Sequence, residues 1–91
     1  MNTLKHVDHH MDNLISDLQK LIQQPSVSAK NEGIEECAKL VKSLLKSSGL
    51  KSEILRLKKG VAPIVFAEIK SKSNPNKTLM FYNHYDVQPA E

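Results

Sequence analysis

The residues with the clearest capacity for chemistry are His84 and Asp86, which lie two positions apart in the segment NHYDVQPAE. They follow the apolar run TLMFYN, and open α/β sheets place ligand sites beyond the carboxyl ends of their strands. A histidine there can offer one ring nitrogen to a metal while a carboxylate fixes its tautomer. We therefore predict His84 as a metal ligand and Asp86 as its supporting acid. The competing interpretation is a strand-capping histidine and an ordinary turn acid, because one histidine and one aspartate cannot close a zinc shell.

Three further histidines lie near the start of the chain, and two serines follow the first proline. His6 and His10 have the i, i+4 spacing of helix-borne zinc ligands, but the glutamate of an HExxH motif is missing. We interpret His6, His9 and His10 as helix-surface residues. Ser26 and Ser28 suggest nucleophiles, yet no histidine base stands in a recognisable motif with them, and turn formation after the proline explains both.

The composition excludes several broad classes of protein. The chain has 91 residues, of which 40% are hydrophobic and 25% charged, and this balance suits one small folded domain rather than a disordered segment. Its formal net charge of +3 comes from scattered lysines, and only 4% of the residues are aromatic. Because nucleic-acid binding proteins cluster their basic residues, we expect no nucleic-acid partner.

The cysteine count and the N-terminal residues bear on the compartment. Cys37 is the single cysteine, so no intrachain disulfide forms, and we expect a buried reduced thiol. The stretch MNTLKHVDHHMDNL carries charges where a signal peptide needs an unbroken apolar region. No segment reaches the length of a membrane span. These features predict a soluble cytoplasmic protein with no membrane partner.

The first half of the chain has the apolar spacing of two helices. Apolar residues recur every three or four positions over residues 3–23, with Thr3 as the expected N-cap and Pro25 ending the run. We expect this stripe to pack against a sheet, because it spans fewer than three heptads of a coiled coil. A second helix is expected over residues 32–48, with Gly49 as its left-handed stop.

The second half of the chain changes to short runs of branched apolar residues, which are typical of strands. Residues 51–58 and 63–70 are expected to pair antiparallel. Residues 78–83, TLMFYN, are expected to form a third strand that is buried on both faces. This order of elements predicts an α/β fold whose last strand needs further cover.

Two short motifs, set in this order of elements, resemble a known enzyme family. The string NHYDVQPAE after an apolar run, with LIQQPSVSA at the end of the first helix, is similar to the zinc metallopeptidase family of carnosinase, cytosolic dipeptidases, acetylornithine deacetylase and succinyl-diaminopimelate desuccinylase. The likeness covers nearly all 91 positions in element order, and HYDVQP and PSVS are its most specific parts. The DVQP string resembles the carnosinase-like dipeptidase branch more than the deacetylase branch, where a DxVP form is more usual.

The resemblance implies that residues 1–91 are the N-terminal part of the catalytic domain of a zinc-peptidase-like three-layer fold. At the matching positions, it implies that His84 is a ligand to one of two zinc ions and that Asp86 is the catalytic-site acid that orients it. In that family the other ligands, the general-base glutamate and the lid-like dimerisation domain lie further along the chain. The implied reaction is hydrolysis of dipeptides or N-acyl amino acids, in which two zinc ions polarise the scissile carbonyl and acidify a bridging water.

One zinc ligand is too few for catalysis, since a catalytic zinc takes three protein ligands and a water. We therefore expect the 91 residues alone to be inactive. Cobalt or manganese could replace zinc, because first-row metals share such sites. The alternatives are a small stand-alone α/β binding module and an oligomerisation domain without catalysis. We expect a homo-oligomer joined through an exposed strand edge at residues 78–83, since strand pairing would satisfy that edge.

Overall fold

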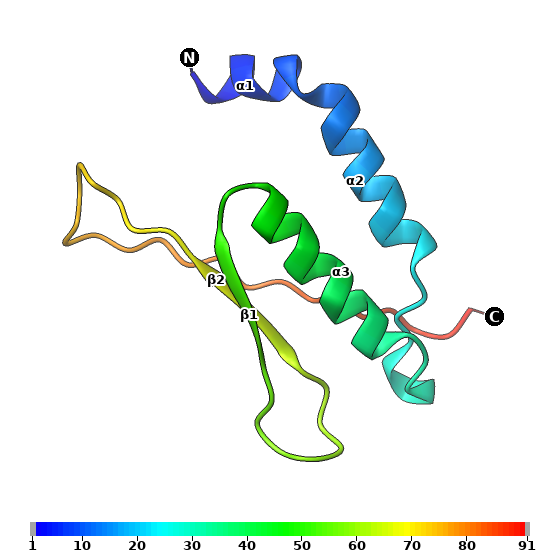
Figure 1. Cartoon of the computed structure of the whole chain (residues 1–91). Coiled ribbons are helices and arrows are strands. Elements are labelled where there is room, and N and C mark those ends of the chain that lie inside the picture. Colours follow the sequence, from blue (N-terminus) through cyan, green and yellow to red (C-terminus); the bar gives the residue numbers. More distant parts are fainter. Residues whose placement is uncertain (1, 91) are drawn as a thin grey trace.

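The first two helices run end to end with a bend between them. The computed structural model describes residues 2–90; α1 covers Thr3–His9 and α2 covers Met11–Gln23 (Figure 1). The expected single helix over residues 3–23 is therefore divided at His10, whose backbone has φ −114° and ψ 15°. The apolar spacing continues across the bend, and for this reason the sequence pattern does not reveal it.

The N-cap of α1 is Asn2 rather than the expected Thr3. The side-chain oxygen of Asn2 accepts a hydrogen bond of 2.8 Å from the backbone N–H of Lys5, which satisfies one of the free donors at the start of the helix. Thr3 is the first helical residue. Asparagine ranks at least as high as threonine as an N-cap, so the earlier residue takes the role.

The ends of α2 and α3 follow the prediction. Helix α2 stops at Gln23, two residues before Pro25, and α3 covers Ile34–Ser47. After α3 the backbone of Gly49 is left-handed at φ +90°, and the N–H of Leu50 donates to the carbonyl of Leu45 at 3.1 Å. This is the Schellman arrangement that a glycine stop predicts.

The two predicted antiparallel strands are present and shorter than expected. β1 covers Lys51–Leu55 and β2 covers Ile64–Glu68, and their register pairs Lys51 with Glu68 and Leu55 with Ile64. Pro63 cannot donate a backbone hydrogen bond, so the pairing begins at the next residue. Helix α3 lies against both strands, which gives a small mixed α/β arrangement (Figure 1).

The expected third strand over residues 78–83 is not formed. This segment pairs with no strand in the described part of the chain, and the side chains of Leu79, Met80, Phe81 and Tyr82 are between 78% and 81% exposed. A strand needs a neighbour for its backbone groups and apolar surfaces for its side chains. The apolar run therefore predicts burial, but residues 2–90 do not supply the covering surfaces.

The core is small and is centred on α3. Its buried apolar residues are Ile34, Cys37 and Ala38, which confirms the predicted buried thiol. The apolar stripe of α1 and α2 does not pack against the sheet as expected, and Leu18 in its middle is 56% exposed. The radius of gyration is 15.3 Å. A compact domain of this length would have a radius of gyration of about 12 Å, so the chain is more extended than such a domain.

Candidate functional site

The backbone of the last described segment is bonded to the turn that follows α2. The N–H of Val87 donates to the carbonyl of Ser26 at 2.8 Å, and Val27 forms a parallel bridge with Val87. The turn itself is closed by two bonds between Val27 and Glu32, of 2.8 and 3.0 Å. These contacts bring together the two segments that carry the family resemblance, PSVS and HYDVQP.

A glycine allows this turn to lie close to the start of α3. Gly33 has a left-handed backbone with φ +74°, and a Cβ atom added there would lie 2.0 Å from the carbonyl oxygen of Pro25. Any other residue would meet both the strained backbone and that steric clash. The turn over residues 25–33 is thus fixed relative to α3.

Tyr85 anchors the closing segment to α3 and to the residue before β2. Its hydroxyl donates to the carbonyl oxygen of Pro63, and its own carbonyl accepts a bond of 3.6 Å from the thiol of the buried Cys37. Partial burial, with the negative groups nearby, raises the pKa of the Tyr85 phenol. The phenol therefore remains a hydrogen-bond donor at neutral pH, and the backbone at position 85 is held between α3 and the sheet.

Asp86 is held by a side chain from the turn. The hydroxyl of Ser28 donates to Asp86 Oδ2 at 2.7 Å. This bond lowers the pKa of the Asp86 carboxyl, partial desolvation opposes it, and a backbone N–H and the nearby His84 ring add to the lowering. The carboxylate is ionised at neutral pH, as a supporting acid must be.

His84 lies beside the second oxygen of the same carboxylate. Its Nδ1 is 3.4 Å from Asp86 Oδ1, and the ring of Tyr82 meets the imidazole edge-on, with centroids 5.6 Å apart and planes at 75°. The His84 side chain is 74% exposed. The two residues predicted from sequence are thus side by side, with Nδ1 of the imidazole on the side of the carboxylate.

The kinds of donor suit zinc, but their number does not complete a site. Within residues 2–90 no group of three or more histidine, cysteine, aspartate or glutamate side chains is placed to hold a metal. His84 would supply one imidazole nitrogen, and Asp86 would support it from the other side of the ring. A catalytic zinc takes three protein ligands, so this arrangement accounts for one of them.

The N-terminal histidines have a different arrangement. The rings of His6 and His10 are stacked with centroids 4.2 Å apart, and Nδ1 of His10 lies 2.9 Å from the carbonyl oxygen of His6. His10 therefore donates to the backbone at the bend between α1 and α2. His6, His9 and His10 are all exposed, as expected of helix-surface residues.

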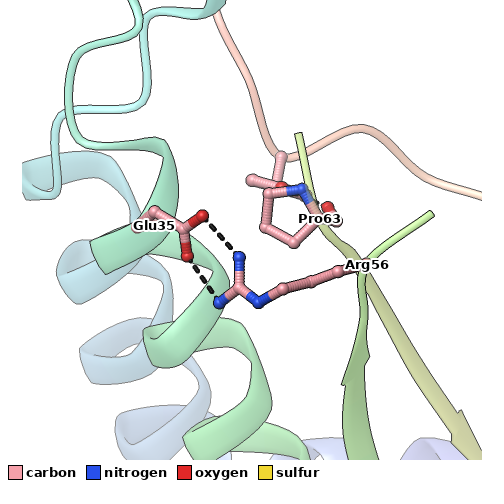
Figure 2. A network of polar contacts seen from close by, with 4 residues as sticks. Glu35, Arg56 and Pro63 are labelled. Carbon is pink, nitrogen blue, oxygen red and sulfur yellow. Dashed lines mark hydrogen bonds and ion pairs between the residues drawn. The ribbon is translucent and has the colours of Figure 1, made fainter. Parts of the chain in front are cut away.

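A bidentate ion pair near the site was not anticipated from the sequence. Arg56 donates from two guanidinium nitrogens to the two carboxylate oxygens of Glu35, at 2.6 and 2.8 Å, and Figure 2 shows this pair beside Pro63. The hydrogen bonds from Arg56 lower the pKa of Glu35 and raise that of Arg56. The pair ties the first turn of α3 to the residue after β1, close to the carbonyl that binds Tyr85.

Comparison with known proteins finds no protein similar to this chain. No protein-family model, curated protein sequence or solved structure matches it. None of the helices in residues 2–90 combines the length and apolar character that a membrane crossing requires.

Proposed function

We propose that these 91 residues form the N-terminal part of a zinc-dependent amide hydrolase acting on dipeptides or N-acyl amino acids. His84 would be a ligand to one zinc ion, and Asp86 would be the carboxylate that orients it. The observation that carries this proposal is the placement of Asp86, whose Oδ2 accepts from Ser28 while Oδ1 lies 3.4 Å from His84 Nδ1. The proposal also uses the resemblance of the two motifs that meet there.

The residues of this chain would act by fixing which nitrogen of His84 carries the proton and how its imidazole ring is oriented. Within the neutral imidazole of His84, the ionised Asp86 favours the tautomer that carries its proton on Nδ1, and the lone pair on Nε2 is then free for the metal. Zinc in such sites polarises the scissile carbonyl and acidifies a bound water. The contribution of this chain is therefore to present Nε2 of the His84 imidazole, in a fixed tautomer, to the metal.

The remaining parts of the active site would come from residues outside this segment. One imidazole is fewer than the three protein ligands that a catalytic zinc needs. The apolar side chains of residues 79–82 and of the α2 stripe are exposed, which suits surfaces that pack against further structure. We propose that the segment alone is inactive, and that the free thiol of Cys37 fits a reducing cytoplasmic setting.

The test is a hydrolysis assay on the polypeptide made from the full open reading frame that encodes these residues. Dipeptides and N-acyl amino acids are supplied to the zinc-loaded protein and to protein stripped with a chelator. We expect zinc-dependent release of free amino acid, lost in the His84→Ala variant and kept in His9→Ala, because His9 lies on the exposed face of α1. Hydrolysis that His84→Ala leaves unchanged would contradict the proposal, as would no zinc-dependent hydrolysis of any substrate.

A further inference from the structure

The hydroxyl of Ser28 reaches the candidate site from a turn 58 positions earlier in the chain. Ser28 is the first residue of a short 3-10 helix, Ser28–Lys30, within the turn that Val27 and Glu32 close. On the other side, the N–H of Val87 is bonded to the carbonyl of Ser26 at 2.8 Å. Backbone hydrogen bonds within the turn and next to Asp86 therefore set the distance between Ser28 and Asp86.

The contact with Ser28 uses one of the two carboxylate oxygens of Asp86. With Oδ2 held at 2.7 Å by the hydroxyl, Oδ1 lies 3.4 Å from His84 Nδ1. An aspartate side chain without a partner samples about three staggered wells, so that orientation would lose much of its population. The serine hydroxyl therefore selects one orientation of the carboxylate.

We propose that Ser28 is a positioning residue of this site, whose hydroxyl holds Asp86 in the orientation that keeps the proton on His84 Nδ1 and leaves Nε2 free to bind a metal. The metal in this statement rests on the proposed function. The orientation of Asp86 and His84 does not, because it follows from contacts within the chain.

The chain offers a matched control within the same turn. Ser26 is buried, and its hydroxyl has no hydrogen-bond partner among the described residues. Ser26→Ala thus removes a hydroxyl from the same segment without removing a bond to Asp86. Ser28→Thr keeps the hydroxyl, and Ser28→Val has the shape of threonine without it.

The experiment is long-range proton–nitrogen NMR of the imidazoles in the 91-residue chain, at a protein concentration at which the chain is monomeric and at a pH well above the usual titration range of histidine. We expect the wild-type chain to favour the Nδ1–H tautomer of His84. Ser28→Ala should lower the ratio of Nδ1–H to Nε2–H by up to about threefold, which corresponds to the loss of one selected well out of three. Ser26→Ala should leave the ratio unchanged, and Ser28→Thr should restore it.

An unchanged tautomer ratio in Ser28→Ala would overturn the inference, and so would an equal change in Ser26→Ala. If Ser28→Ala fails to fold, the comparison of Ser28→Thr with Ser28→Val decides the point, since the two differ only in the hydroxyl. The NMR sample contains no zinc, so its result is separate from the hydrolysis assay. If Ser28→Ala shifts the tautomer ratio but no zinc-dependent hydrolysis is found, the role of Ser28 in orienting Asp86 is supported and the role of His84 as a metal ligand is contradicted.

Discussion

Single side chains join parts of this chain that lie far apart in the sequence. Cys37 bonds to the backbone of Tyr85, 48 positions later, and Ser28 bonds to Asp86. The pairing of His84 with Asp86 could be predicted because the two residues are near neighbours in sequence. The bond from Ser28 could not, since apolar periodicity says which face is buried and not which polar groups meet.

The Glu35 and Arg56 pair should make the stability of α3 depend on pH. The pKa of Glu35 is lowered in the folded chain, so its contribution is present above the unfolded pKa and is lost as the pH falls through the folded one. As the pH is lowered beyond about 4.5, we expect the melting temperature of the wild-type chain to decrease more steeply than that of Glu35→Gln. Circular dichroism melts at neutral and acid pH would measure the difference.

Glu36 provides the control for that experiment, because it also lies in the first turn of α3 and has no ion pair within residues 2–90. Glu36→Gln removes a charge near the same helix end and tests the effect of the helix dipole alone. We expect Glu36→Gln to keep the acid dependence of the wild type. The same loss of acid dependence in both variants would argue against a specific role of the Arg56 contact.

Secondary structure followed from the sequence wherever a local signal determined it. The proline after α2 and the glycine after α3 stop those helices as expected, and the antiparallel pairing of β1 and β2 is confirmed. The bend at His10 and the missing strand at 78–83 were not predicted. A bend leaves the apolar spacing intact, and a strand depends on a neighbour that its own residues do not encode.

Two glycines with similar backbones should differ in their tolerance to alanine. At Gly49, φ is +90° and a Cβ would meet no atom within 4 Å, so Gly49→Ala should lower the free energy of unfolding by about 1 to 2 kcal/mol. At Gly33 a Cβ would also lie 2.0 Å from the carbonyl oxygen of Pro25, and the loss should be at least about 1 kcal/mol larger. Urea unfolding would compare them. Equal losses would contradict the close approach of the turn to α3.

At the scale of the whole molecule, a small core coexists with two exposed apolar surfaces. The buried residues Ile34, Cys37 and Ala38 all lie on α3, whereas the α2 stripe and residues 79–82 face outward. Composition predicted a folded chain with enough apolar residues for a core, but it could not say which of them the chain itself would bury. The candidate site lies beside the exposed apolar surface of residues 79–82 because His84 and Asp86 follow that run in the sequence.

The exposed run should make the isolated chain associate. Strand pairing or apolar contact between copies would cover Leu79 and Phe81, which are each 79% exposed. We expect sedimentation to show association that rises with protein concentration and weakens in the double variant Leu79→Lys, Phe81→Lys. Leu57→Lys is the control, because Leu57 is 71% exposed and belongs to a different segment, the loop between β1 and β2.

A monomeric wild-type chain with a cooperative melt would contradict that expectation. It would favour the reading of the chain as a stand-alone α/β module, since such a module needs no further cover for its apolar residues. Association that the double variant leaves unchanged, but Leu57→Lys abolishes, would place the contact elsewhere.

The most direct test of the central claim, that His84 is a zinc ligand supported by Asp86, is the zinc content of the polypeptide encoded by the full reading frame. Metal analysis after dialysis would compare the wild type with His84→Ala and His9→Ala. We expect the wild type and His9→Ala to retain zinc and His84→Ala to hold at least about one zinc ion fewer per polypeptide, because removing a ligand opens the zinc shell. Equal zinc content in all three proteins would contradict the assignment of His84.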